Sequence, residues 1–220
     1  MNILKKSKEE ESENELLNMN GWECIEKAFS DVYPNQDNPK HYGTLIPFIL
    51  GGNDPIDGVS VYDGGDYWHF VTFGLTELYE KETDNPEYSG YGMEFTLKLK
   101  KDCYDTENEE NEIKCIIGIL QQIAKITFNS GELFQENEYI YTGQKQGIDF
   151  YQKSLLTGFI TVADSKIKSI NTPNGKVNFI EFIGVTDDEL IMIKNKNMTV
   201  QEFYKILGSD VTDYRRKSVF

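Results

Sequence analysis

One segment of the chain, Tyr91–Leu99, alternates strictly between apolar and polar side chains. Successive side chains of a β-strand point to opposite faces of a sheet, so a period of two is typical of a strand with one apolar face. The apolar positions are Met93, Phe95, Leu97 and Leu99, and the polar positions are Glu94, Thr96, Lys98 and Lys100. The segment therefore predicts a strand within a sheet, and the other elements are interpreted around it.

Five further segments combine apolar or strand-forming residues with turn signals at their ends. They are Tyr42–Leu50, Val59–Tyr62, Tyr67–Leu75, Leu155–Ala163 and Val177–Val185. The turn formers Asp63-Gly-Gly-Asp66 separate the second segment from the third and predict a tight turn between two strands.

Two longer stretches have the apolar spacing of helices. The first begins at Leu16 and should end at Tyr33, because Pro34 disfavours helical geometry at the residue before it. The second is expected near Ile113–Asn129. The acidic stretch before it, Asp102–Glu112, has low hydrophobicity and is interpreted as a linker.

Two shorter helices are expected near the C-terminus. Thr186 is a candidate N-cap because three acidic residues follow it, and another helix should begin after Thr199. The order of helix, strands, helix, strands and helices predicts an α+β fold, a single domain with a mixed, mostly antiparallel sheet flanked by helices. The domain should span residues 16–220, after a polar lead-in at residues 1–15.

The net charge is −15, from 37 acidic and 22 basic residues. Such a surface repels phosphate backbones, so nucleic-acid binding is not expected, whereas a basic protein partner would be attracted. The alternative interpretation is that the charge only keeps the protein soluble. Cys24, Cys103 and Cys115 form no Cys-x-x-Cys pair and are expected to be free thiols. With neither a signal peptide nor a membrane span in the sequence, a cytoplasmic location is expected.

The residues available for catalysis are few. His41 and His69 form no ligand pair with spacing typical of a metal site, and a lone histidine in a strand is more often a hydrogen-bonded structural residue. Ser60 sits in a string similar to a nucleophile elbow, but the closing glycine is missing. We therefore expect no catalytic residues, no metal and no cofactor. An enzyme with a scattered active site is the least favoured of three hypotheses.

Six strings of residues follow one another from Val32 to the C-terminus. They are Val32–Gln36, Gly51–Tyr62, Tyr67–Tyr79, Ser89–Leu99, Thr172–Leu190 and Val211–Phe220. In content and order they resemble strings of the Suppressor of fused domain family, such as its "GGPDPLDG" turn and its "SGFGFELTFRL" strand. The chain departs from the family pattern at Asn53, usually proline, and at Tyr67, where the first histidine of "HWH" is common.

This resemblance implies a fold similar to the N-terminal domain of the two-domain animal members, which clamp an extended peptide between their domains. Tyr79 matches a tyrosine of that peptide cleft, and Asp84 and Glu87 are candidates for its partnering aspartate. Bacterial single-domain members of the family are regarded as immunity proteins that neutralise a toxin, often a nuclease.

We therefore expect a non-catalytic protein-binding domain, with an immunity protein, or antitoxin, that occludes a basic toxin domain as the first hypothesis. The alternative is a regulator or adaptor that binds an extended peptide. Acidic side chains would attract the partner and tyrosines would anchor it. The candidate binding residues are Tyr79, Glu80, Glu82, Asp84, Glu87, Tyr88 and Tyr91. The 102–112 run is a second source of charge, and for the tyrosines packing on the sheet is the competing explanation. The oligomeric state is left open.

Overall fold

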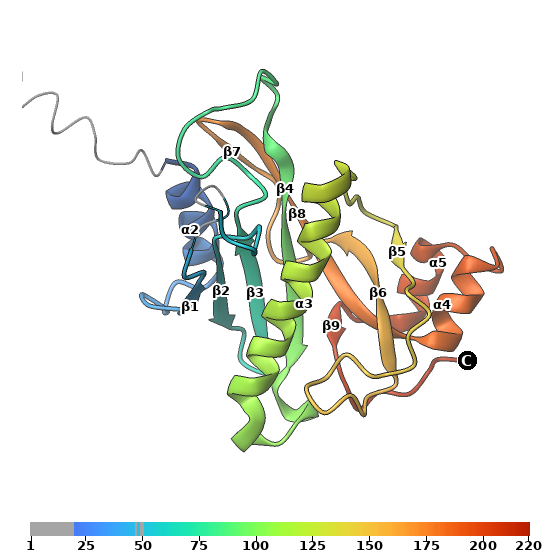
Figure 1. Cartoon of the computed structure of the whole chain (residues 1–220). Coiled ribbons are helices and arrows are strands. Elements are labelled where there is room, and N and C mark those ends of the chain that lie inside the picture. Colours follow the sequence, from blue (N-terminus) through green and yellow to red (C-terminus); the bar gives the residue numbers. More distant parts are fainter. Residues whose placement is uncertain (1–19, 47, 49–50) are drawn as a thin grey trace, which may run out of the picture.

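The computed structural model describes residues 20–46, 48 and 51–220. Within them, nine strands form one sheet in the order β1-β2-β3-β4-β8-β6-β5, with β7 paired to β8 and β9 to β4 (Figure 1). The strands are β1 (Lys40–Gly43), β2 (Gly58–Asp63), β3 (Tyr67–Phe73), β4 (Tyr88–Lys100), β5 (Tyr139–Ile140), β6 (Leu156–Ala163), β7 (Ile170–Thr172), β8 (Gly175–Thr186) and β9 (Val211–Thr212). The helices are α2 (Asn20–Val32), α3 (Glu109–Ser130), α4 (Asp187–Lys194) and α5 (Val200–Leu207).

The sheet is mixed and mostly antiparallel, as predicted. β4 is its central strand, and it runs parallel to β8 and to β9, whereas the other paired strands are antiparallel. The turn at Asp63–Asp66 joins β2 and β3 as a hairpin. Among the described helices, none is long and apolar enough to cross a membrane.

Helices cover both faces of the sheet (Figure 1). The apolar residues of β4 pack with the buried side of α3, where Ile116 and Leu120 are fully buried. On the opposite face, α2 covers one end of the sheet through Ile25 and Phe29, and α4 with α5 covers the other end. The domain is therefore a three-layer arrangement with two apolar clusters on the face away from α3.

Charged side chains are buried between these two clusters. Lys98 of β4 is fully buried, and its Nζ lies 2.8 Å from both Glu181 Oε2 and Asp210 Oδ2 and 3.2 Å from Asp164 Oδ1. Asp164 also contacts His69, which is fully buried and lies 2.7 Å from it. This ionic cluster, defined as Lys98, Asp164, Glu181, Asp210 and His69, joins the sheet to the loops that follow β6 and α5.

Three expectations about element limits need correction or fall partly outside the described residues. The strand expected at Tyr42–Leu50 is wrong for residues 44–46 and 48, because β1 ends at Gly43, and residues 47, 49 and 50 lie outside the described part. The first helix is confirmed over Asn20–Val32, whereas residues 16–19 and the lead-in at 1–15 are not described.

The stretch Asp102–Glu112 is not a linker. Lys101–Cys103 and Thr106–Asn108 form short 3-10 turns, and α3 already begins at Glu109. Acidic residues are favoured in the first turn of a helix by its dipole, so the low hydrophobicity of this stretch reflects a helix start. Glu112 is buried, and its carboxylate accepts a hydrogen bond from Phe150 N.

Candidate partner-binding site

The acidic loop, residues 80–87, connects the region after β3 to the start of β4 at one end of the molecule (Figure 1). Its four acidic side chains are exposed to solvent. They are Glu80, Glu82, Asp84 and Glu87. The structure therefore places the four predicted acidic residues together on one surface, where they can attract a cation from a distance.

The acidic loop is held in place by Glu77, whose side chain is only 8% exposed. One carboxylate oxygen accepts hydrogen bonds from Glu82 N at 2.7 Å and Thr83 N at 2.5 Å. The other accepts from Gly90 N at 2.9 Å and from Lys81 Nζ at 2.8 Å. Burial raises the pKa of Glu77, but these donors outweigh it and bring the pKa down to about 2.

Two asparagines complete the support of the acidic loop. Asn174, in the turn between β7 and β8, donates from Nδ2 to the carbonyl oxygens of Glu77 at 2.7 Å and Tyr79 at 3.3 Å. Asn85 accepts a hydrogen bond from Glu87 N at 2.9 Å within the loop. The sequence does not reveal the contact of Asn174 with this region, because Asn174 lies 97 residues from Glu77.

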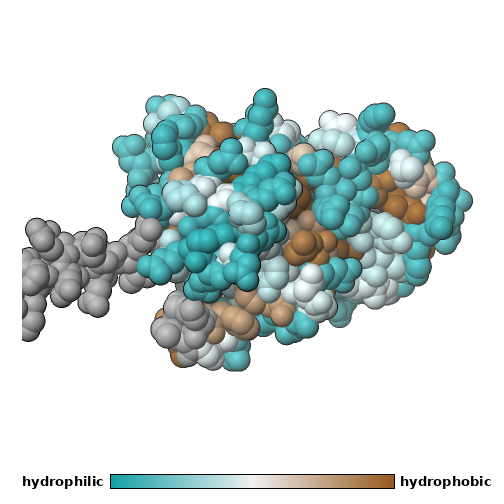
Figure 2. Space-filling model, turned by 90° about the horizontal axis from the view of Figure 1, so that it is seen from above, coloured by the Kyte–Doolittle hydropathy of each residue, from teal (hydrophilic) through white to brown (hydrophobic). Residues whose placement is uncertain are grey.

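Beside the acidic loop lies a groove of about 760 Å³. It is bordered on one side by Tyr88, Tyr91 and Met93 of β4 and on the other by the segment 131–136, which follows α3. Figure 2 looks onto this end of the molecule and shows hydrophobic residues in the middle of a face that is otherwise mostly hydrophilic. We call the groove between β4 and the segment 131–136 the β4 groove.

A break in strand pairing lies at the β4 groove. Tyr88 pairs with Lys176 and Met93 with Asn178, so the pairing between β4 and β8 shifts register between them. Gly92 has a φ of +75°, and a Cβ there would lie 2.8 Å from the ring of Tyr88. Only glycine combines that backbone conformation with so close an aromatic neighbour. The residues between Tyr88 and Met93 therefore bulge out of the pairing with β8, which is made again at Tyr88.

The three predicted tyrosines lie in two different places. Tyr88 and Tyr91 border the β4 groove, where the ring of Tyr91 packs edge-on against Phe128 at 5.1 Å. Tyr79 is half-buried in the apolar cluster under α2. Burial raises its pKa, and the charge of Asp57 adds to that effect. The structure thus brings Tyr88 and Tyr91 together with the acidic loop, whereas Tyr79 packs mainly in the core.

The other acidic run, residues 102–112, lies at the opposite end of α3 (Figure 1). Its last residues are engaged within the fold. Lys40 Nζ donates to Glu109 at 2.9 Å, and the hydroxyl of Tyr42 donates to Glu110 at 2.8 Å. The two acidic runs therefore form no continuous surface.

The two histidines hold structural positions. Nδ1 of His69 is 2.8 Å from the hydroxyl of Tyr33, and Nδ1 of His41 is 3.0 Å from Ser60 Oγ. Ser60 lies inside β2 with 1% exposure, so it does not occupy the exposed strand-to-helix turn of a nucleophile elbow. In the part of the chain that the structure describes, no group of three or more histidine, cysteine or acidic side chains is placed to hold a metal ion.

Comparison with known proteins agrees with this fold. The sequence is 28% identical over 174 residues to human and mouse proteins described as "Suppressor of fused homolog". That match covers 72% of the chain but 34% of each relative, so the chain spans about a third of the length of these relatives.

Two solved structures share the fold. A chain of the Sufu–Fu complex crystal structure superposes with a TM-score of 0.80 at 27% identity, over 92% of this chain and 93% of that one. Drosophila Suppressor of fused superposes with a TM-score of 0.78 at 27% identity, over 92% of this chain and 52% of that one. The expected similarity to the N-terminal domain of Suppressor of fused is confirmed. The sequence model of the family described as Suppressor of fused protein (SUFU) matches residues 52–217, and the chain belongs to this family.

Proposed function

We propose that this chain is a non-catalytic immunity protein that binds a basic toxin through the acidic loop and the β4 groove. The toxin would be a secreted protein, such as a nuclease, and the complex would form in the cytoplasm by stoichiometric occlusion. The observation that supports this proposal best is the acidic loop itself. Its four exposed carboxylates are held by the Glu77 anchor beside a groove that Tyr88, Tyr91 and Met93 border.

A nuclease needs cationic side chains to hold phosphates, and an acidic surface can cover those side chains. Because the loop is already tied down by Glu77 and Asn174, less conformational entropy is lost when a partner binds. The β4 groove would then accept apolar or aromatic side chains of the partner, which supply most of the binding energy in protein interfaces.

A second candidate is a regulator or adaptor that captures an extended peptide. The β4 groove favours it, because a strand borders the groove, as does the structural relative described as a complex of Sufu with Fu. The two candidates differ in the partner: the first requires a toxic protein, and the second a peptide of a protein that is harmless to the cell. An enzyme with a scattered active site would be indicated by a cofactor that copurifies with the protein.

Co-expression tests the proposal. The toxin candidate is the product of a neighbouring gene with a secretion domain and a basic C-terminal domain. Under the proposal, this chain restores growth of cells that express the toxin domain and forms a complex with it at micromolar concentration. If growth stays blocked and no complex forms, the immunity function is rejected.

A pair of matched variants locates the interface. Glu82→Lys/Asp84→Lys/Glu87→Lys reverses the exposed charges of the acidic loop. The control, Asp102→Lys/Asp105→Lys/Glu107→Lys, changes the net charge equally at the other end of α3. The loop variant should slow association and weaken its salt dependence, whereas the control should stay close to the wild type. Equal slowing by both variants would remove the loop from the interface.

A further inference from the structure

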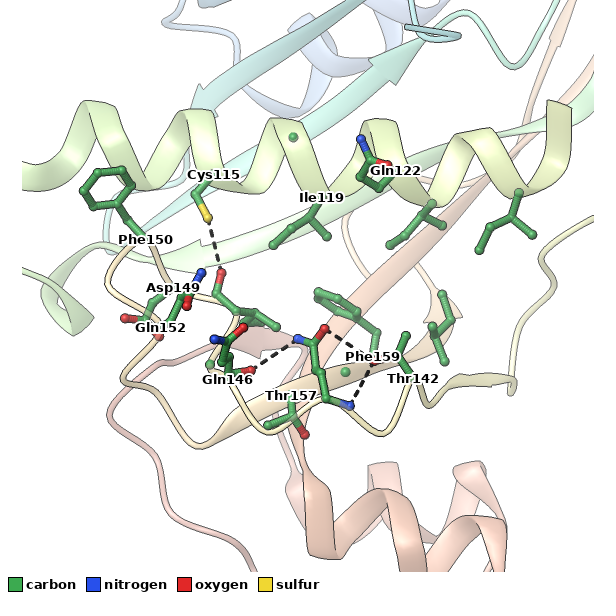
Figure 3. A pocket seen from close by; sticks show the side chains of 18 residues that line it. Cys115, Ile119, Gln122, Thr142, Gln146, Asp149, Phe150, Gln152, Thr157 and Phe159 are labelled. Atoms are coloured by element: carbon green, nitrogen blue, oxygen red, sulfur yellow. Dashed lines mark hydrogen bonds between the residues drawn. The ribbon is translucent and has the colours of Figure 1, made fainter. Parts of the chain in front are cut away.

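A second pocket lies far from the acidic loop, between α3 and the chain segment 140–152, and we call it the α3 pocket. Its volume is about 430 Å³. Figure 3 shows Ile119 of α3 and Phe159 of β6 pointing toward one another across it. Ile123 and Ile140 extend the apolar lining. The pocket is therefore a small apolar hollow rather than a flat surface patch.

One position of α3 that lines the α3 pocket has no side chain. Gly118 lies in the middle of α3, and a Cβ at this position would meet nothing within 4 Å. Glycine is, after proline, the least favourable residue in a helix interior, and no close packing of the described residues requires it here. Gly158, on the opposite wall, differs, because a Cβ there would lie 2.4 Å from the Ile140 carbonyl oxygen. Gly118, an exposed residue of the lining, thus leaves open space beside the helix.

Apart from Asp149, the polar part of the lining is neutral. Four glutamines border the pocket, and the Gln144 side chain bonds within its own loop to Thr142 and to the Gln146 carbonyl oxygen (Figure 3). The Cys115 thiol donates to the carbonyl oxygen of Ile148 at 3.4 Å, and burial raises its pKa to about 11, so it stays uncharged. The lining glutamines are Gln122, Gln144, Gln146 and Gln152.

The charged residues of the lining limit which ligands the α3 pocket can bind. Among the described residues that line the α3 pocket there is no lysine, arginine or histidine, so an anionic group would find no counterion. The one carboxylate of the lining, Asp149, accepts hydrogen bonds on both oxygens, from Lys153 N at 3.0 Å and Ser154 N at 2.6 Å. Asp149 is also only 8% exposed, so the glutamines are the more accessible polar groups of the lining, and their neutral amides can both donate to and accept from a neutral head group.

We propose that the α3 pocket binds a small neutral amphiphile, an aliphatic chain of about eight carbons with an amide- or ester-type head group. The chain lies against the isoleucines of α3 and Phe159, and the head group contacts the glutamines at the mouth. This site is separate from the partner-binding surface and does not depend on the proposed immunity function.

Octanamide is a suitable probe, with octanoate and octylammonium as its charged counterparts. In protein labelled at the isoleucine δ1 methyl groups, octanamide should shift the signals of Ile119, Ile123 and Ile140. The signals of Ile25 and Ile193, which lie in the other two apolar clusters, should not move. Octanoate and octylammonium should bind at least tenfold more weakly. Equal binding of either charged compound, or no shift with octanamide at 1 mM, would overturn the proposal.

Gly118→Leu provides the matched variant, because its side chain enters the empty space beside the helix. It should lower the affinity for octanamide at least tenfold while the protein stays folded. Asn129→Leu adds the same side chain to an exposed position of α3 outside the pocket lining and should leave binding unchanged. If Gly118→Leu binds octanamide like the wild type, the α3 pocket is not the site. If it weakens only a protein complex and the wild type binds no octanamide, the small-ligand proposal is wrong.

Discussion

Nζ of Lys98 lies 2.8 Å from the Glu181 carboxylate, and both side chains are fully buried on the sheet face opposite α3. Burial lowers the pKa of Lys98, but the surrounding carboxylates outweigh it and hold the pKa above its ordinary value. Burial, together with the charge of Asp164, raises the pKa of Glu181. One ammonium group therefore contacts carboxyl groups from three segments and offsets part of their mutual repulsion between two apolar clusters.

Lys98→Met should destabilise the fold strongly, because it leaves the carboxylates of Asp164, Glu181 and Asp210 buried without their cation. The expected loss in the free energy of unfolding is about 3–5 kcal/mol, measured by urea denaturation. Adding Glu181→Gln to Lys98→Met should recover part of the loss. Lys27→Met, which removes an exposed ion pair with Asp31, should cost less than about 1 kcal/mol and serves as the control. A similar cost for both lysines would mean that the ionic cluster is not stabilised by Lys98.

Glu94→Gln should change how stability depends on pH. The fully buried carboxylate accepts hydrogen bonds from Thr72, Gly74 and Thr76, yet burial outweighs them and raises its pKa to about 7. Because the folded pKa exceeds the ordinary value of 4.5, the folded protein binds an extra proton between these values. Its contribution to stability is complete below pH 4.5 and is lost as the pH rises through 7.

Across that pH range the wild type should lose up to about 3 kcal/mol more of its unfolding free energy than the glutamine variant does. Glutamine imitates the protonated acid, so the two proteins should be about equally stable at low pH. Urea denaturation at a series of pH values checks this. If the unfolding free energy of the variant depends on pH as it does in the wild type, this dependence arises from another group.

Much of the fold could be predicted from local patterns, and the reason is visible in β4. The alternation of Met93 and Phe95 with Glu94 correctly separates the two faces of the strand. It does not reveal that the polar face is buried as well. Lys98 meets Asp164, Glu181 and Asp210, which lie 66, 83 and 112 residues away, and no local spacing encodes such contacts.

The candidate site also has one part that the sequence predicts and another that it does not. The acidic residues of the loop could be identified from composition, because a run of exposed charges is local. The anchor could not, since Glu77 resembles any surface glutamate until it is placed beside the backbone N–H groups of Glu82, Thr83 and Gly90. Tyr79 and Tyr88 also look equivalent in the sequence, and only the packing separates them.

Glu77→Ala should loosen the acidic loop without unfolding the domain. The backbone N–H groups of Glu82, Thr83 and Gly90 lose their acceptor, so their hydrogen exchange should accelerate at least tenfold. Glu80→Ala, at an exposed neighbouring position, should leave exchange unchanged. In the wild type, the pKa of about 2 lies below the ordinary value, so the anchor is fully present above pH 4.5 and is lost as the pH falls toward 2. Unchanged exchange in the alanine variant would contradict the role of Glu77 as anchor.

Substitution of the tyrosines separates binding from packing. Tyr88→Ala removes a half-buried ring at the β4 groove and should weaken the partner complex at least tenfold with little loss of stability. Tyr91→Ala also loses the contact with Phe128, so it should weaken the complex and cost about 2 kcal/mol of unfolding free energy. Tyr79→Ala should reduce stability and leave the affinity of the folded protein nearly unchanged, because its ring packs under α2.

Calorimetric titration of the partner and urea denaturation of each variant measure the two effects separately. Tyr88→Phe keeps the ring and should retain most of the affinity, which distinguishes ring packing from a hydrogen bond of the hydroxyl. If Tyr79→Ala weakens the complex more than Tyr88→Ala does, the partner contacts the α2 side of the acidic loop instead of the β4 groove. The interface would then be shifted toward Tyr79 and Asp57, whose charge contributes to the raised pKa of that tyrosine. The charge-reversal variants of the acidic loop would remain a valid test in that case, because Tyr79 and Tyr88 flank the loop in the sequence.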